Sequence, residues 1–260
     1  MSDRIAVFGG VYSNHLALRA ALDDIRRRGV HAIYCLGDLG AFGPNPDKVF
    51  PLLLDGGVTT IQGNYDNSIA LGLDDCQCGY TDTRDNHYAR ISYQYTFRRT
   101  SEPFRNWMRT LPATRRLEIG GRRVLLCHGS PRRMNEFLWE STTPTHFLEK
   151  LCDDEGADVI LATHTGLHWR RRLSGGREFI NVGVLGRPEN DGAARVLYAM
   201  LTFDKELELE FSPVEYDYAG LAREMREESL PEAFIETIMT GWWTTCLEIL
   251  PAKERRRGKY

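Results

Sequence analysis

The fold is decided between Arg4-Ile5-Ala6-Val7-Phe8 and His31-Ala32-Ile33-Tyr34-Cys35-Leu36, two short apolar runs with the length and composition of buried β-strands. The residues between them, 14–28, place apolar side chains at helical spacing. Asn14 is the expected N-cap of this helix, and Gly29 is its expected C-terminal stop. A strand, a helix and a strand in succession, repeated along the chain, predict an α/β protein with a largely parallel sheet.

The rest of the chain adds further strands and then returns to helices. Four more apolar runs bounded by turn residues predict strands over 58–62, 115–119, 123–127 and 159–163. From about residue 168 the pattern changes to short alternating runs, which predict antiparallel strands over 169–173, 178–182, 194–202 and 206–211. Amphipathic helices are expected over 218–228 and 231–239. We therefore expect a main domain over 1–215 and a C-terminal helical extension with a basic tail over 216–260.

Composition excludes several classes of protein. The 260 residues, 42% of them hydrophobic, can bury a large core, and the formal net charge of −3 gives no global basic field that would favour nucleic acid. The first residues are too charged for a signal peptide, and no window approaches a membrane span. We expect a cytoplasmic protein that does not bind membranes, and the sequence leaves homo-oligomer formation open.

The six cysteines, at 35, 76, 78, 127, 152 and 246, show no paired framework and indicate a reducing compartment. Cys76-Gln77-Cys78 could be half of a zinc site, but no second pair stands at metal-binding spacing. Packed free thiols are therefore the favoured interpretation of this pair.

Four polar residues stand at the ends of predicted strands, namely Asp38, Asn64, His128 and His164. In open α/β sheets the ligand crevice lies at the carboxyl ends of the strands, so these side chains are expected to converge. Imidazole, amide and carboxylate groups together suit a divalent transition metal such as Mn, Fe, Ni or Zn. The sequence therefore predicts a metal site at this edge.

The motifs around these residues carry a resemblance. They read Leu36-Gly37-Asp38, Gln62-Gly63-Asn64-Tyr65-Asp66, Leu126-Cys127-His128-Gly129-Ser130-Pro131-Arg132 and Thr163-His164-Thr165-Gly166. In order and spacing this resembles the calcineurin-like metallophosphoesterases, in particular their bacterial single-domain branch, from about Ile5 to about Tyr198. The resemblance implies a four-layer α/β/β/α sandwich and metal-dependent hydrolysis of phosphoesters.

The chain departs from the pattern of that family at one of its two metals. The resemblance implies that Asp38, Asn64, His128 and His164 hold one metal, whereas the ligands that belong only to the other fall on Gly10, Tyr12 and Gly166. Because all three losses affect the same metal, we expect a single divalent metal ion. A second ion would require replacement ligands, for which His15 and His168 are the nearest candidates in sequence.

Five residues are expected to act on the substrate. Arg132 is the candidate for gripping a phosphate oxygen, because guanidinium matches phosphate bidentately, although a solvated loop arginine is the alternative. Tyr65 stands where the family often has a general acid, and Asp66 would orient local groups or the His128 ring. Tyr12 and Asn14 are assigned to substrate binding, with an organic group of the substrate stacked on Tyr12.

These assignments predict hydrolysis of a phosphodiester or phosphomonoester in a small soluble substrate. The alternative is a catalytically inactive protein of the same fold that binds a nucleotide or a protein partner, which the three replaced ligands favour. A nucleic-acid-binding function lacks a basic stripe, except over residues 253–260. Trp242 and Trp243 could mark a partner surface or pack onto the domain, and packing is favoured.

Overall fold

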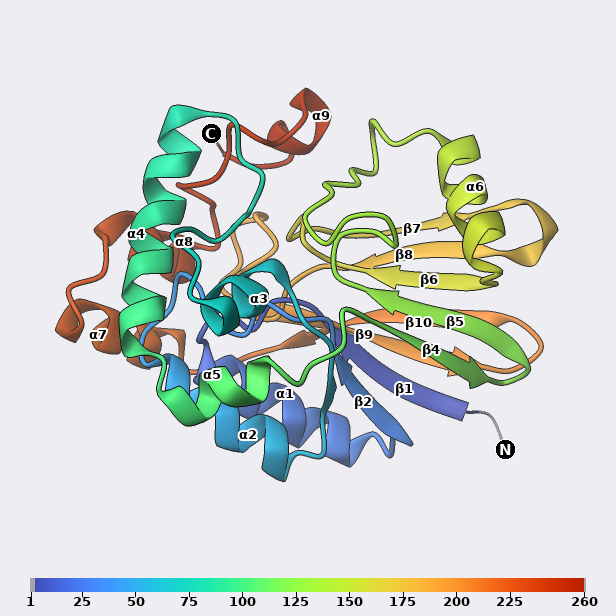
Figure 1. Ribbon diagram of the computed structural model, residues 1–260, viewed down its shortest axis with the longest axis horizontal. Helices are drawn as coiled ribbons and strands as arrows, with labels where there is room; N and C mark the ends of the chain where they lie inside the picture. Colours follow the sequence, from blue (N-terminus) through green and yellow to red (C-terminus); the bar gives the residue numbers. More distant parts are fainter. Residues whose placement is uncertain (1–2, 260) are drawn as a thin grey trace.

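The computed structural model describes residues 3–259, in which two five-stranded sheets pack face to face (Figure 1). The first sheet has the order β10-β9-β1-β2-β3. Strands β1, β2 and β3, of which β3 is an edge strand, run parallel to one another. Strand β9 is antiparallel to β1, and β10 is antiparallel to β9. The bounds are β1 (Asp3–Phe8), β2 (Ala32–Cys35), β3 (Thr59–Thr60), β9 (Val196–Phe203) and β10 (Leu207–Val214).

The second sheet has the order β4-β5-β6-β8-β7. Strands β5, β6 and β8 are parallel, and the two edge strands β4 and β7 are antiparallel to their neighbours. The expectation of purely antiparallel pairing after residue 168 is therefore wrong for β8, which pairs with β6 in parallel. Strand β7 lies in the chain segment that connects β6 and β8. The bounds are β4 (Thr114–Ile119), β5 (Arg122–Cys127), β6 (Val159–Ala162), β7 (His168–Arg172) and β8 (Glu178–Val182).

Helices cover the outer faces and the carboxyl end of the sheets (Figure 1). The N-cap of the first helix is Asn14, as expected, whose side chain accepts a hydrogen bond from the amide of Ala17. The helices are α1 (His15–Arg27), α2 (Val49–Asp55), α3 (Asn64–Leu71), α4 (Thr83–Arg99), α5 (Glu102–Met108), α6 (Thr145–Glu155), α7 (Tyr218–Glu227), α8 (Glu232–Thr240) and α9 (Ala252–Arg255), with 3-10 turns η1 (Pro46–Lys48) and η2 (Ser174–Gly176).

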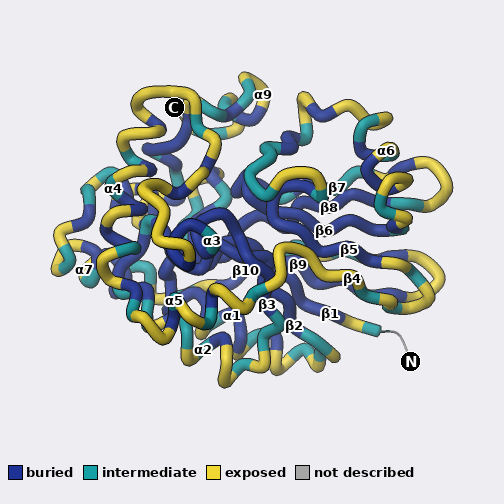
Figure 2. Tube along the Cα trace, viewed as in Figure 1, coloured by how far each residue is buried: buried dark blue, intermediate teal, exposed yellow. Residues whose placement is uncertain are grey.

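The alternation of β1 shows how the layers form. Ile5 and Val7 point into the core between the two sheets, whereas Ala6 and Phe8 point into the core shared with α1 and α2. On the far side α6 packs on the outer face of the second sheet, and the tube in Figure 2 shows the strands as the buried centre. The protein is thus an α/β/β/α sandwich, as expected.

The C-terminal residues fold back onto the carboxyl end of the sheets. Helices α7 and α8 pack with Tyr95 of α4, and Trp243 is buried with Trp139 and Leu167. Packing is therefore the correct interpretation for Trp243. The acidic group of Glu254 is also buried, where it accepts a hydrogen bond from the amide of Ser141 at 2.8 Å. Within residues 3–259, no helix has the length and apolarity needed to cross a bilayer.

Cys76 and Cys78 form a disulfide, so the expectation of free thiols is wrong for this pair. Gln77 between them adopts a left-handed conformation with φ 51°, which turns the chain so that the two Cα atoms lie 5.2 Å apart. This separation lies within the range that a disulfide spans. The other four cysteines are free and buried.

Candidate metal centre

Three metal-ligating side chains meet at the carboxyl ends of parallel strands. Asp38 follows β2, His128 follows β5 directly, and His164 follows β6. Asp38 and His164 both adopt left-handed backbone conformations, with φ of 59° and 71°. Such conformations are uncommon outside glycine and asparagine and cluster at functional sites. One donor atom from each of the three lies within 4.8 Å of the others, as expected from the sequence.

The two imidazoles are held in the tautomers that ligation requires. His128 Nδ1 lies 2.6 Å from the carbonyl oxygen of Leu36, so it donates there and Nε2 faces the other ligands. That Nε2 lies 3.3 Å from Asp38 Oδ2 and 3.2 Å from His164 Nδ1. His164 Nε2 in turn lies 3.2 Å from the carbonyl oxygen of Cys78. A histidine that binds a metal usually donates its other ring N–H in this way.

Asn64 supplies an oxygen with no competing partner. Its side-chain Oδ1 is buried and accepts no hydrogen bond from any residue in the described range 3–259. The amide nitrogen is instead fixed, because Nδ2 donates to the carbonyl oxygen of Cys76 at 2.8 Å and approaches Cys78 Sγ at 3.4 Å. A buried carbonyl oxygen left unpaired is costly unless a ligand completes it. The four residues therefore fit a divalent metal ion.

Asp66 organises the backbone around this site. Its carboxylate accepts hydrogen bonds from the amides of Asp38, Gly63 and Leu39 at 2.8, 2.8 and 3.0 Å. Burial and the nearby Asp38 carboxylate raise the pKa of Asp66 to about 7. The expectation that Asp66 orients local groups matches these contacts, but the His128 ring is held by Leu36 and not by Asp66.

Charge is distributed unevenly over the three ligands. Burial opposes ionisation of Asp38, but the adjacent His128 outweighs it and lowers the pKa of the carboxyl group. Burial also opposes protonation of His128, but the negative charge and hydrogen bond of Asp38 outweigh burial and raise the pKa of His128. Burial and the neighbouring His128 lower the pKa of His164 to about 3. His164 is therefore the neutral imidazole that a metal prefers.

The Tyr65 hydroxyl is turned towards α4. Its side chain is buried, and the hydroxyl group lies 2.9 Å from Ser92 Oγ in α4. Burial raises the pKa of this phenol well above its ordinary value. Only its backbone amide serves the site, donating to Asp38 Oδ1 at 3.0 Å. The phenol is thus part of the packing between α3 and α4, and its role as proton donor stays a prediction.

The three residues expected to bind substrate have different surroundings. Arg132 is exposed and faces Glu136 at 3.7 Å and the Phe147 ring at 5.1 Å, which matches the solvated-loop alternative. Asn14 is fully buried, and its Nδ2 donates to the carbonyl oxygen of Gly186 at 3.2 Å while Oδ1 caps α1. Both polar atoms of Asn14 are therefore used within the protein, and its contact with substrate stays a prediction.

Tyr12 packs into the space beside Gly10. A Cβ atom at Gly10 would lie 2.4 Å from Tyr12 Cε1, so the ring occupies the volume that a longer residue there would use. Trp243 plays the same part at Gly166, where a Cβ atom would lie 2.8 Å from Trp243 Cη2. The vacated positions are thus filled by aromatic rings, and Tyr12 borders only small cavities. Stacking of a substrate group on Tyr12 stays a prediction.

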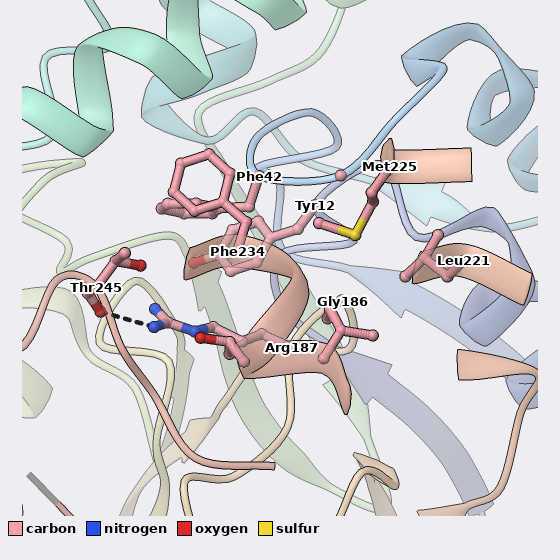
Figure 3. Close-up of a pocket in the computed structure, with 11 residues that line it drawn as sticks. Tyr12, Phe42, Gly186, Arg187, Leu221, Met225, Phe234 and Thr245 are labelled. Atoms are coloured by element: carbon pink, nitrogen blue, oxygen red, sulfur yellow. Dashed lines mark hydrogen bonds between the residues drawn. The ribbon is translucent and has the colours of Figure 1, made fainter. Parts of the chain in front are cut away.

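Arg187 is a residue that the sequence analysis did not identify. Its guanidinium carbon lies 3.9 Å from the centroid of the Trp243 ring. Its Nη2 donates to the carbonyl oxygen of Thr245 at 2.7 Å (Figure 3). Arg187 stands five residues after Val182 at the end of β8, the next parallel strand after β6. Its position after a parallel strand is the signal that could have identified it.

Comparisons with known proteins agree with this architecture. The family model of the calcineurin-like phosphoesterase superfamily domain matches residues 4–206. A metallophosphoesterase from Sphaerobacter thermophilus is 25% identical, with a TM-score of 0.70 over 93% of this chain and 100% of that one. A hypothetical protein from Pyrococcus horikoshii is 21% identical, with a TM-score of 0.78 over 93% and 99% of the two chains. An uncharacterized protein of Methanocaldococcus jannaschii is 26% identical over 91% of this chain and 98% of its own length.

The chain belongs to the calcineurin-like phosphoesterase superfamily. It is a hydrolase of the metallophosphoesterase class, whose chemistry is the cleavage of phosphoester bonds with a divalent metal. The family relationship agrees with the resemblance expected from the motifs around Asp38, Asn64, His128 and His164.

Proposed function

We propose that this protein hydrolyses a phosphodiester or phosphomonoester of a small molecule, using one divalent transition metal held by Asp38, Asn64, His128 and His164. The observation that carries the proposal is the convergence of the Asp38, His128 and His164 donor atoms within 4.8 Å. The unpaired Asn64 Oδ1 adds a fourth donor. Nitrogen and oxygen donors of this kind suit Mn, Fe, Ni or Zn.

The use of one metal is supported by what surrounds the triad. Tyr12 and Trp243 fill the space next to Gly10 and Gly166. The two histidines that could have supplied replacement ligands face carboxylates elsewhere. His15 Nε2 lies 3.4 Å from Glu224, and His168 Nδ1 contacts Glu189. A second metal would have to displace these contacts.

A divalent metal held there would polarise the phosphoryl group and make a bound water more acidic. The protein residues keep that site in shape. Leu36 and Cys78 fix the two imidazole tautomers, and Asp66 holds the amides of the turns that carry Asp38 and Gly63. Preorganised ligands of this kind need no rearrangement when the substrate binds.

Hydrolysis of bis(p-nitrophenyl) phosphate and p-nitrophenyl phosphate, with added Mn, Fe, Ni or Zn, tests the proposal. We expect turnover with at least one of these metals, and loss of turnover in His128→Ala, because that variant removes a ligand and its hydrogen bond to Leu36.

His87→Ala is the matched control, because His87 is an exposed histidine of α4 that contacts only the Tyr88 ring among the aromatic pairs described. Its turnover should equal that of the wild type. Full activity in His128→Ala, or no turnover of either ester with any metal, would refute the proposed function.

A further inference from the structure

Arg187 is a buried cation without a carboxylate partner. The residue is 7% exposed, and within residues 3–259 it forms no ion pair, although the Asp85 carboxylate acts on it from a greater distance. The guanidinium has five N–H donors, and the hydrogen bond described for it is the one to the Thr245 carbonyl oxygen. Its flat faces pack on the rings of Trp243 and Phe42, at 3.9 and 5.5 Å. Burial lowers the pKa of Arg187 even though the Asp85 carboxylate and the neighbouring Cys246 and Tyr12 act in the opposite direction, so the charge is only partly compensated. An anion that pairs with the guanidinium would supply the missing compensation.

The backbone that carries Arg187 is fixed to the loop after β1. The amides of Leu185 and Gly186 both donate to the carbonyl oxygen of Gly10, at 3.0 and 2.8 Å. The Asn14 side chain donates to the carbonyl oxygen of Gly186. A Cβ atom at Gly186 would lie 2.1 Å from the carbonyl oxygen of Val11, so only glycine allows this approach. Asn14 is therefore a positioning residue for Arg187.

Arg187 and the metal ligand His164 open onto the same cavity. Both line a cavity of about 10 Å³ at the carboxyl end of the sheets, together with Tyr12 and the C-terminal residues Trp243 and Cys246. This is the space of one water molecule, and therefore of one oxygen atom of a ligand. On its other side Arg187 borders an apolar pocket formed with α7 and α8, drawn in Figure 3. The guanidinium thus lies at the boundary between the metal centre and the C-terminal helices.

We propose that Arg187 binds a phosphoryl oxygen of the substrate in the cavity that it shares with the metal ligand His164. This inference rests on the proposed function, because it assigns the group that holds the phosphoryl end of that substrate. A guanidinium forms strong charged hydrogen bonds to phosphoryl oxygens, and the surrounding aromatic rings keep those bonds out of water. The cavity has room for one such oxygen. It takes the role that the sequence suggested for Arg132, whose exposed side chain already faces Glu136.

Binding of inorganic phosphate to the metal-loaded protein tests this proposal, because phosphate is the smallest ligand with the required oxygens. In Arg187→Met, which keeps an unbranched side chain against Trp243 but removes charge and donors, the dissociation constant of phosphate should rise roughly 10- to 100-fold, the loss of charged hydrogen bonds. Arg187→Lys should recover part of the affinity. Isothermal titration calorimetry measures all three proteins, and elemental analysis should give the same metal content for each.

Arg132→Met is the matched control and should bind phosphate as tightly as the wild type. Unchanged phosphate affinity in Arg187→Met, or a comparable loss in Arg132→Met, would overturn the proposal. A fall in thermal stability of Arg187→Met with unchanged phosphate affinity would likewise assign Arg187 a packing role. If Arg187→Met does not fold, Arg187→Lys and Arg187→Gln provide the same comparison.

The two proposals fail in different ways. Phosphate binding that depends on Arg187, with no ester turned over by the wild type, would refute the hydrolase proposal and leave the Arg187 site intact. Turnover that persists in Arg187→Met with an unchanged KM would refute the role of Arg187 and leave the hydrolase intact. Wild-type protein that holds metal but binds no phosphate would overturn the Arg187 site.

Discussion

The chemistry of this protein depends on a few side chains whose orientation is set by backbone carbonyl groups. His128 donates a ring N–H to the carbonyl oxygen of Leu36, and His164 donates one to the carbonyl oxygen of Cys78. The other ring nitrogen of each histidine faces the candidate metal site. The Asn64 side chain is fixed through its nitrogen in the same way, by Cys76. Loss of one such supporting hydrogen bond commonly lowers the affinity for the metal by a factor of about 10 to 100.

Asn64→Ala tests the fourth donor. The substitution removes the buried unpaired Oδ1, so the affinity for the metal should fall at least about tenfold, by analogy with losses around other metal sites. Titration of Co²⁺ followed by its visible absorption measures the affinity. Asn67→Ala, in the same helix, removes an amide that bonds to Gln62 and should leave the affinity unchanged. Equal affinities in Asn64→Ala and the wild type would remove Asn64 from the ligand set.

Asp66→Ala tests the support of the turns. Three amide groups, of Asp38, Leu39 and Gly63, would lose their acceptor. Since each unpaired buried donor costs about 1–3 kcal/mol, the free energy of unfolding should fall by about 3 kcal/mol or more. Urea denaturation measures it. Asp66→Asn keeps one acceptor oxygen and should give a smaller loss, whereas equal stability of Asp66→Ala and wild type would show that the turns are held by other contacts.

At this scale the sequence predicted which residues converge but not how each side chain points. Asp38, His128 and His164 could be predicted because each follows a strand of a parallel sheet, where carboxyl ends share an edge. The Tyr65 hydroxyl turns to Ser92, and Asn14 turns to Gly186, because of contacts with residues 27 and 172 positions away. No local pattern encodes such long-range partners. Arg187 was missed for the same reason, since its burial depends on Trp243 and Thr245.

Strands β5 and β6 deliver two of the ligands, so their register determines the spacing of His128 and His164. At the opposite end of the two strands, contacts between Arg123 and Asp158, here called the clamp, fix this register. Asp158, just before β6, accepts hydrogen bonds from the backbone amide and the guanidinium of Arg123 in β5, at 2.9 and 2.7 Å. The amide of Asp158 donates to the carbonyl oxygen of Arg123 at 2.8 Å. The hydrogen bond from Arg123 lowers the pKa of Asp158 to about 2.

Asp158→Asn should therefore lower stability in a pH-dependent way. Because the pKa is lower in the folded protein, the ionised carboxylate stabilises the fold above the unfolded pKa of about 4, and this contribution is lost as pH falls towards about 2. The pair is partly exposed, so the difference should be about 1 kcal/mol or less. Urea denaturation at pH 6, 4 and 3 should show the difference between the two proteins shrinking with acidification. A difference that grows on acidification would contradict the clamp.

The segment 76–78 supports two ligands at once, through the carbonyl oxygens of Cys76 and Cys78. Replacing both cysteines by serine removes the disulfide that shapes this segment. Metal affinity should then fall by about tenfold, as for other losses of supporting contacts. Titration with Co²⁺ measures it. Cys152→Ser, at a buried free cysteine of α6, should leave the affinity unchanged, and equal affinity of the double variant and wild type would contradict the supporting role.

The regular elements were predictable where their periodicity was strong. Residues 4–8, 123–127 and 218–228 gave strand and helix positions within a residue or two of those observed. The strand over 178–182 was expected to be antiparallel, because alternation reveals a strand but not its partner. It pairs with β6 on one side and β7 on the other. Helix α4 has no strong apolar stripe, because its buried residues include the polar Asp85, Ser92 and Thr96, and the sequence pattern did not predict its bounds.

At the scale of the whole molecule the site lies where both sheets and the C-terminal residues meet. Ligands come from β2 of one sheet and from β5 and β6 of the other, so the sandwich must form before the site exists. The metal should therefore bind the folded protein and not the unfolded chain. It should raise the free energy of unfolding by about 2.7 kcal/mol when the free metal concentration is a hundredfold above the dissociation constant.

Removal of the metal should lower the melting temperature on the order of 5 °C for a protein of this size. Circular dichroism with and without EDTA measures the change. His164→Ala, which lacks a ligand, should show almost no response to EDTA. A melting temperature of the wild type that is indifferent to EDTA would contradict a metal site built by the fold.

The central claim is that Asp38, Asn64, His128 and His164 hold a single metal ion. Elemental analysis of protein purified without chelator tests it most directly. We expect one divalent transition metal ion per chain in the wild type and none in His128→Ala. Two ions per chain in the wild type, or an undiminished content in His128→Ala, would contradict the account.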